Sequence, residues 1–211
     1  ASLKRQINIL RRELQSRAHR KPSFLRGLSP TVSFCSNPVL GNTKATIALI
    51  EFSDYFCPYC SRFHRATFEM IRKNYIDKGK LLYVSRDFPR AMAPKAVDAA
   101  IAVNCAGKQG AYWKMQKILY RYSPGINRAF YKSTAINFGL DSKKYIDCLD
   151  DDQQRSAVTR DFSYGKALGI RGTPTFYVGR VSGNKIINAT TIVGAQPYAK
   201  FSQTIDRLLA T

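Results

Sequence analysis

The amino-acid sequence predicts an α/β fold that an all-helical domain interrupts, and three stretches of the chain carry this prediction. Residues 46–88 show the pattern of a strand, a helix and a second strand. Residues 92–168 carry apolar residues at helical spacing. Strand patterns return over residues 175–193, and residues 197–209 have the pattern of a closing helix. We therefore expect a sheet built from both parts of the chain, with the helical stretch inserted between them.

The first predicted strand, residues 46–52 (TIALIEF), is almost entirely apolar or β-branched, which is typical of a strand covered on both faces. The segment after it is predicted to be helical, with Phe63 and Ile71 among charged residues. The second predicted strand, residues 80–88 (KLLYVSRDF), ends before Pro89. In such a unit the helix begins beyond the carboxyl end of the first strand, where open α/β sheets place their active sites.

Five helices are expected in the inserted domain, because apolar residues recur at helical spacing between turn signals. They cover residues 93–106, 112–122, 130–138 and 142–150, and a last helix ends at Leu168 and Gly169. Two strands follow, at 175–178 and 185–193, joined by a turn around Ser182-Gly183-Asn184.

Residues 1–16 have the pattern of an amphipathic helix, whose apolar residues are spaced by four, three and four positions. So short a helix is marginal alone in water, so its apolar side must pack on the body of its own chain or on a second copy. Residues 16–30 have the Pro, Gly and polar content of a linker, which favours a second copy. We expect a homo-oligomer, with a dimer favoured, assembled through residues 1–16.

The composition is that of a globular protein, since 45% of the 211 residues are hydrophobic and 12% are aromatic. The 34 Lys and Arg against 14 Asp and Glu give a formal charge of +20, which favours anionic partners in general. No nucleic-acid-binding motif accompanies the charge, so no nucleic-acid partner is expected. The sequence has neither an apolar run of about eighteen residues nor a signal-like N-terminal segment, so no membrane span is expected.

The strongest chemical signal is the motif Cys57-Pro58-Tyr59-Cys60 at the start of the first predicted helix. A thiolate is stabilised at a helix start by the aligned backbone dipoles, so Cys57 is the predicted nucleophile. Cys60 lies one turn further into the helix and is the predicted resolving thiol. A second motif, Gly172-Thr173-Pro174-Thr175, leads directly into a predicted strand. The pair of motifs indicates a redox dithiol that needs no cofactor besides its own disulfide.

A zinc site is the structural alternative for this motif, with His64 as a third ligand. Structural zinc sites have four ligands, and the remaining histidine, His19, lies far away in the linker. No metal site is therefore expected. A protein that binds copper or zinc through the two cysteines, without redox turnover, is the alternative function.

The order of elements and motifs resembles the DsbA-like branch of the thioredoxin superfamily over roughly residues 40 to 210. The matching features are Glu51 six positions before Cys57, the aromatic pair Tyr55-Phe56, the CPYC motif and Gly172-Thr173-Pro174. The dipeptide between the cysteines is also that of DsbG-like isomerases and glutaredoxins. The threonine before the proline, Thr173, resembles the residue found at this position in the isomerases of the family. The resemblance implies a thioredoxin fold with a helical insertion, preceded by an oligomerisation helix.

The resemblance also implies roles for the site residues. Glu51 would accept a proton from Cys60, and Thr173 with Pro174 in a cis-proline loop would hold an extended substrate peptide. Pro58 and Tyr59 would tune the dithiol and contact substrate. From the residues alone, a strand-edge carboxylate paired with a basic residue is the favoured interpretation of Glu51, and an ordinary trans proline is the commoner situation for Pro174.

Cys105 and Cys148 fall in two different predicted helices of the insertion. They resemble the second, structural disulfide of some DsbA-like proteins. Two buried free thiols are an equally good interpretation of the residues themselves. Cys35 is unpaired in this scheme, as a buried thiol or an intermolecular link.

The expected domains are residues 1–30 (helix and linker), 31–90 and 170–211 (two parts of the thioredoxin domain) and 91–169 (helical insertion). The expected function is thiol–disulfide exchange, forming or isomerising disulfide bonds in reduced or misoxidised secreted proteins. The expected compartment is the periplasm, where a membrane redox partner would recycle the dithiol. A glutathione-using relative ranks last, because such relatives commonly carry a serine in place of the cysteine pair.

Overall fold

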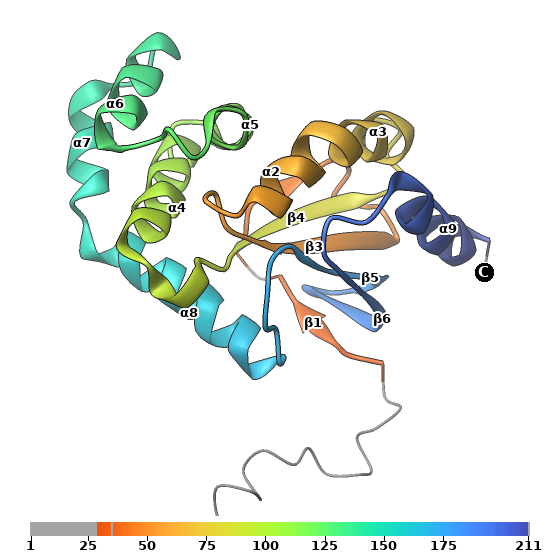
Figure 1. Cartoon of the computed structure of the whole chain (residues 1–211). Coiled ribbons are helices and arrows are strands. Elements are labelled where there is room, and N and C mark those ends of the chain that lie inside the picture. The colour runs from red at the N-terminus through yellow and green to blue at the C-terminus, as the bar shows by residue number, and fades with distance from the viewer. Residues whose placement is uncertain (1–28, 35, 211) are drawn as a thin grey trace, which may run out of the picture.

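The computed structural model describes residues 29–34 and 36–210, and within them the strands form one mixed sheet (Figure 1). The order across the sheet is β1-β6-β5-β3-β4-β2. The predicted helix over residues 1–16 and Cys35 lie outside the described residues. The strands are β1 (Val32–Ser33), β2 (Val39–Leu40), β3 (Ile47–Ser53), β4 (Leu82–Asp87), β5 (Thr175–Ser182) and β6 (Lys185–Val193).

The central strand β3 joins the two halves of the fold. It pairs parallel with β4, where Glu51 lies opposite Ser85, and antiparallel with β5, where Glu51 lies opposite Phe176. The four long strands follow the predicted pattern. The two short strands β1 and β2 were not predicted, because a two-residue edge strand shows no alternation.

Helices cover one face of the sheet, and alternate residues of β3 explain why. Ile47 and Leu49 point into a core shared with the helices that follow β3 and with the last helix, whereas Ala48 and Ile50 point to the opposite face. These helices are the run α2 (Pro58–Phe63), η2 (His64–Phe68), α3 (Glu69–Ile71) and η3 (Arg72–Ile76), and the closing helix α9 (Tyr198–Leu209). Figure 1 shows α2 and α3 above the sheet and α9 at its right.

The predicted inserted domain is a helical block beside the sheet, with a core of its own. Tyr55 and Cys60 from the sheet domain pack into that core. Tyr122, the last residue of its helix, is 52% exposed although the helix over residues 112–122 was predicted from its apolar spacing. The block contains η4 (Arg90–Met92), α4 (Pro94–Gly107), α5 (Tyr112–Tyr122), α6 (Arg128–Asn137), α7 (Ser142–Leu149) and α8 (Asp152–Ala167).

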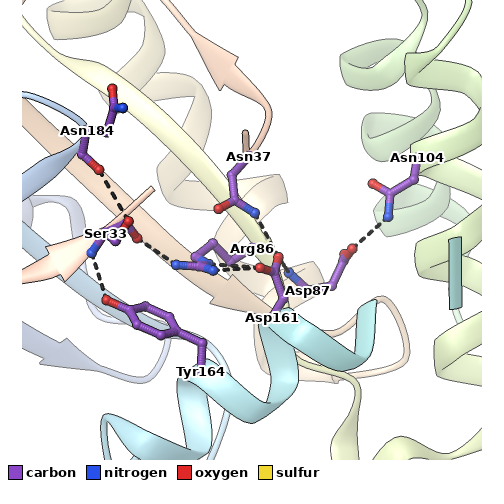
Figure 2. A network of polar contacts seen from close by, with 8 residues as sticks. All are labelled: Ser33, Asn37, Arg86, Asp87, Asn104, Asp161, Tyr164 and Asn184. Carbon is purple, nitrogen blue, oxygen red and sulfur yellow. Dashed lines mark hydrogen bonds and ion pairs between the residues drawn. The ribbon is translucent and has the colours of Figure 1, made fainter. Parts of the chain in front are cut away.

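A buried polar network fixes the block to the sheet (Figure 2). The Arg86 guanidinium on β4 donates to the Asp161 carboxylate on α8 at 2.7 Å. The second Asp161 oxygen accepts from the backbone N–H of Asp87 and from the Asn37 side chain. The Asn104 amide on α4 donates to Asp87 at 2.9 Å. The end of β4 is thereby held by two helices of the insertion.

Close packing also ties α8 to the sheet. A Cβ atom on Gly165 would lie 2.6 Å from the ring of Phe88, so the helix can approach this closely only with glycine there. Among the described residues, no helix combines the length and apolar character needed to cross a bilayer.

Candidate active site

Cys57 occupies the start of α2, directly beyond the carboxyl end of β3. Its backbone is extended, and Pro58 takes the first helical position, where the missing N–H costs nothing. The carbonyl of Cys57 accepts from the N–H of Ser61 at 3.1 Å. The Cys57 side chain is half-buried, so it can meet another molecule.

Hydrogen bonds lower the pKa of Cys57 from 9.0 to about 6. The largest cause is the Cys60 thiol, which donates to the Cys57 sulfur; partial burial opposes it. The Thr173 side chain and the backbone N–H groups of Cys60 and Tyr59 add to the lowering. At neutral pH the thiolate therefore predominates, and when Cys57 is protonated its Sγ can donate to the Thr173 carbonyl at 3.3 Å.

Cys60 has the opposite electrostatic environment. It is fully buried, and burial raises its pKa well above the usual value, with the Cys57 hydrogen bond and the charge of Glu51 adding to the effect. Two thiols whose pKa values are pushed apart in this way can take different roles, one as nucleophile and one as proton donor.

Glu51 lies in the centre of β3 and is fully buried, so it is not a strand-edge carboxylate. Its side-chain partner is His64, whose Nε2 lies 3.1 Å from Oε2. The Tyr83 hydroxyl donates to the same oxygen. The His64 ring stacks on Tyr120 with centroids 3.9 Å apart. Glu51 is thus near enough to Cys60 to influence its pKa, and it is held by two neighbouring elements.

A groove of about 890 Å³ opens beside Cys57. Its lining includes Pro58, Tyr59 and Thr173, so four of the predicted site residues meet there. Tyr59 is 55% exposed at the groove, whereas Pro174 is buried. The Thr173-Pro174 peptide bond is cis. Cys60 and Glu51 lie behind this surface.

Two site residues were missed as such by the sequence reasoning. Asp54 is 4% exposed and accepts hydrogen bonds from the backbone N–H groups of Phe56 and Arg90, both at 2.7 Å, which couples the cysteine loop to η4. His64 was considered only as a zinc ligand. Its position four residues after Cys60, on the same side of the helix, is the signal that places it beneath the dithiol.

The structure joins Cys105 on α4 to Cys148 on α7 by a disulfide with Cα atoms 5.7 Å apart. This bridge lies inside the helical insertion and contributes no atom to the groove.

The ligand set of the zinc alternative is not assembled. The Nε2 atom of His64 is engaged by Glu51. No group of three or more His, Cys, Asp or Glu side chains that could hold a metal occurs in the part of the chain that the structure describes. The metal-binding alternative is therefore not favoured.

The sequence matches a protein-family model and several curated proteins. Residues 35–207 match the family model described as Thioredoxin. A protein of Rickettsia conorii named as a protein-disulfide oxidoreductase is 28% identical over 158 residues, which is 71% of this chain and 56% of the relative. A similarly named Rickettsia prowazekii protein is 28% identical over 79% of this chain and 62% of the relative. The chain thus spans little more than half the length of these curated relatives.

Two solved structures are similar over nearly the whole described fold. Wolbachia pipientis alpha-DsbA1 superposes with a TM-score of 0.76 at 27% identity, covering 85% of this chain and 94% of that one. Bacillus subtilis BdbD, in its oxidised form, superposes with a TM-score of 0.74 at 25% identity, covering 87% of this chain and 98% of that one. The likeness includes the sheet and the helical insertion.

Proposed function

Because this chain belongs to the thioredoxin family, in its DsbA-like branch, we propose that it is a thiol–disulfide oxidoreductase acting on secreted proteins outside the cytoplasm. The observation that carries the proposal is the asymmetry of the dithiol. Cys57 is accessible with a pKa lowered to about 6, while Cys60 is buried behind it with a raised pKa. A metal ligand pair needs no such asymmetry, whereas an exchange reaction does.

Oxidation of a substrate proceeds in two exchanges. A substrate thiolate attacks Sγ of Cys57 in the Cys57–Cys60 disulfide, and the Cys60 sulfur leaves with the bond electrons and takes up a proton. A second substrate thiolate then attacks the substrate sulfur of the mixed disulfide and releases Cys57 as a thiolate. Two electrons pass from the substrate to the protein, which ends as the dithiol. The low pKa of Cys57 makes it a good leaving group in the second exchange.

Glu51 is the proposed proton acceptor for Cys60 when the dithiol is oxidised again. Burial is the main cause of the raised pKa of Cys60, and the Glu51 charge is close enough to add to it, which supports this role. Thr173 is the proposed contact for the substrate backbone, since its carbonyl lies 3.3 Å from the Cys57 sulfur. Reoxidation requires an electron acceptor, for which a membrane redox partner is proposed.

The balance between forming and isomerising disulfides depends on assembly. Two copies joined through residues 1–16 would place two dithiols across a shared cleft, which suits isomerisation, whereas a monomer suits oxidation of new substrates. Molar mass in solution, measured with and without residues 1–16, separates the two. An unchanged monomeric mass removes the isomerase role.

The reduction potential of the Cys57–Cys60 pair, measured by equilibration with glutathione, tests the oxidase role. We expect a value near the oxidising end of the family range, about −120 mV, because a stabilised thiolate favours the reduced form. C57S is expected to abolish exchange, and C60S to accumulate the mixed disulfide. Exchange activity that survives in C57S, or stoichiometric chelator-resistant metal in the reduced full chain, would overturn the proposal.

A further inference from the structure

The walls of the groove beside Cys57 carry positive charge from four separate elements. Arg90 belongs to η4, Lys95 to the first turn of α4, Lys166 to the last turn of α8, and Arg171 to the loop that leads to Thr173. All four residues are exposed. Cys57 thus lies at a surface that basic side chains surround from both sides of the domain boundary.

The groove has little negative charge of its own. Asp54 is the one carboxylate among the described lining residues, and it is 4% exposed. Both of its oxygens accept backbone N–H groups, so it cannot extend toward a ligand. Its charge interacts with that of Arg90.

These groove cations also differ from many other basic residues of the surface. Arg72, Lys117, Arg128 and Lys143 each lie within 3.3 Å of a carboxylate. In the described part of the chain, no carboxylate lies within ion-pair distance of the side chains of Lys95, Lys166 or Arg171. Among the described residues that line the groove, the four cations outnumber the single carboxylate, so the groove keeps a net positive charge.

Apolar side chains line the same groove as these cations, namely Phe56, Phe88, Phe162 and Ile170. An extended polypeptide in this groove would therefore meet both apolar and cationic side chains. Exposed charges beside a binding surface act mainly on the rate of encounter and on the choice between partners.

We propose that this groove selects polypeptide substrates that carry acidic residues close to the reacting cysteine. The inference rests on the proposed exchange function and names its substrate class. The carboxylates of the substrate pair with Lys95, Lys166 and Arg171 while its cysteine reaches Cys57. The covalent step is the exchange already given, in which one substrate thiolate forms a bond to Cys57 and the Cys57–Cys60 bond breaks.

The test uses three dithiol peptides that differ only in the residues flanking one cysteine, which are acidic, neutral or basic. The rate constant for their oxidation by the oxidised full chain is measured by stopped flow at low and high salt. We expect the acidic peptide to react about tenfold faster than the neutral one at low salt, and the difference to shrink as salt screens the charges. Dividing each rate by that of the neutral peptide removes changes in the reactivity of Cys57.

Two charge-reversal variants test whether the preference for the acidic peptide comes from the groove or from the overall charge of the protein. K95E/K166E/R171E changes the groove, and we expect it to lose or invert the preference for the acidic peptide. K73E/K78E/K80E changes the net charge by the same amount on η3 and the segment before β4, and we expect it to keep most of the preference. Equal losses in the two variants would assign the effect to overall charge and overturn the groove proposal.

The remaining outcomes distinguish a failure of the proposed selectivity for acidic substrates from a failure of the proposed exchange function. Oxidation of all three peptides at one rate would overturn the selectivity and leave the exchange function standing. Failure to oxidise any peptide would overturn both.

Discussion

The Nε2 atom of His64 lies 3.1 Å from Oε2 of Glu51, and together they form the polar centre beneath the dithiol. Glu51 is fully buried, and His64 is 8% exposed. The carboxylate has no Lys or Arg partner among the described ion pairs, so an imidazole and the Tyr83 hydroxyl supply its polar contacts. Burial is the largest cause of the raised pKa of Cys60, and the Glu51 charge that adds to it is held in place by a residue from the same helical run as Cys60.

Replacing His64 should lower the stability of the protein, because the buried Glu51 carboxyl loses a polar contact. H64L removes the partner and leaves the buried Glu51 carboxyl without its imidazole contact, so we expect the free energy of unfolding of the reduced protein to fall by about 1–3 kcal/mol. Chemical denaturation at neutral pH measures it. H64Q, which keeps a donor on a similar stem, should lose less.

The double variant E51Q/H64L provides the control. Removing the charge together with its partner avoids the buried unpaired group, so the double variant should be more stable than the sum of the two single losses implies. Strictly additive losses would mean that the two side chains do not interact.

The alkylation rate of Cys57 should follow a titration with a midpoint near pH 6. The thiolate is the reactive form, and the pKa is lowered to about 6 chiefly by the Cys60 thiol. Iodoacetamide labelling across pH 4 to 9, in a C35S background, reports it, with each adduct located by peptide mass. C60A should move the midpoint upward because the main donor to the thiolate is lost.

The lowered pKa of Cys57 also makes the stability of the reduced protein depend on pH in a definite direction. Because the folded pKa of Cys57 is lowered, its contribution to the stability of the reduced form is complete above about pH 9 and is lost as the pH falls through about 6. The oxidised form has no thiolate there, so it should lack this part of the pH dependence. If the alkylation of Cys57 instead had its midpoint near pH 9 in both wild type and C60A, Cys57 would not be the thiol of lowered pKa, and its assignment as nucleophile would be contradicted.

Local patterns in the sequence were sufficient to predict the main helices and strands and the redox dithiol. The apolar run of β3 and the Cys57-Pro58 step at a helix start depend on neighbours in the chain, and both lie where they were predicted. Thr173 was placed beside Cys57 through the family resemblance, since nothing local links residues 116 positions apart.

Relationships that depend on three-dimensional packing were not predictable in the same way. The Glu51–His64 pair depends on how the helical run beyond Phe63 packs on β3, and that run widens into π-helix at η2. The network of Arg86, Asp87 and Asp161 joins segments about 75 residues apart, and single polar residues give no periodic signal. The cations of the groove were visible only as overall charge.

Asp87 gives the network of Figure 2 a pH dependence. Burial, and then the charge of Asp161, raises the pKa of Asp87 to about 7. A raised folded pKa means that protonation of Asp87 stabilises the fold. This contribution is complete below about pH 4 and is lost as the pH rises through about 7.

D87N should therefore stabilise the protein most at high pH. Its Oδ1 can still accept from Asn104, and it has no charge to bury. We expect its advantage in unfolding free energy to grow by roughly 2–3 kcal/mol between pH 5 and pH 8. Denaturation at the two pH values measures it. D150N removes an exposed carboxylate that pairs with Arg128, and it should show no comparable trend. A trend of equal size in D150N would indicate an effect of net charge.

The Cys105–Cys148 disulfide should stabilise the insertion without setting the chemistry of the dithiol. It closes a loop across a separation of 43 residues between α4 and α7, and cross-links of this span restrict the unfolded chain by about 2–4 kcal/mol. C105A/C148A should lose stability in that range. The pKa of Cys57 is set by Cys60, Thr173 and nearby backbone N–H groups, and the bridge is not among these causes, so its alkylation midpoint should stay near pH 6. A shift of the midpoint in this variant would show that the insertion holds the start of α2 in place, through the core that Tyr55 and Cys60 share with α4.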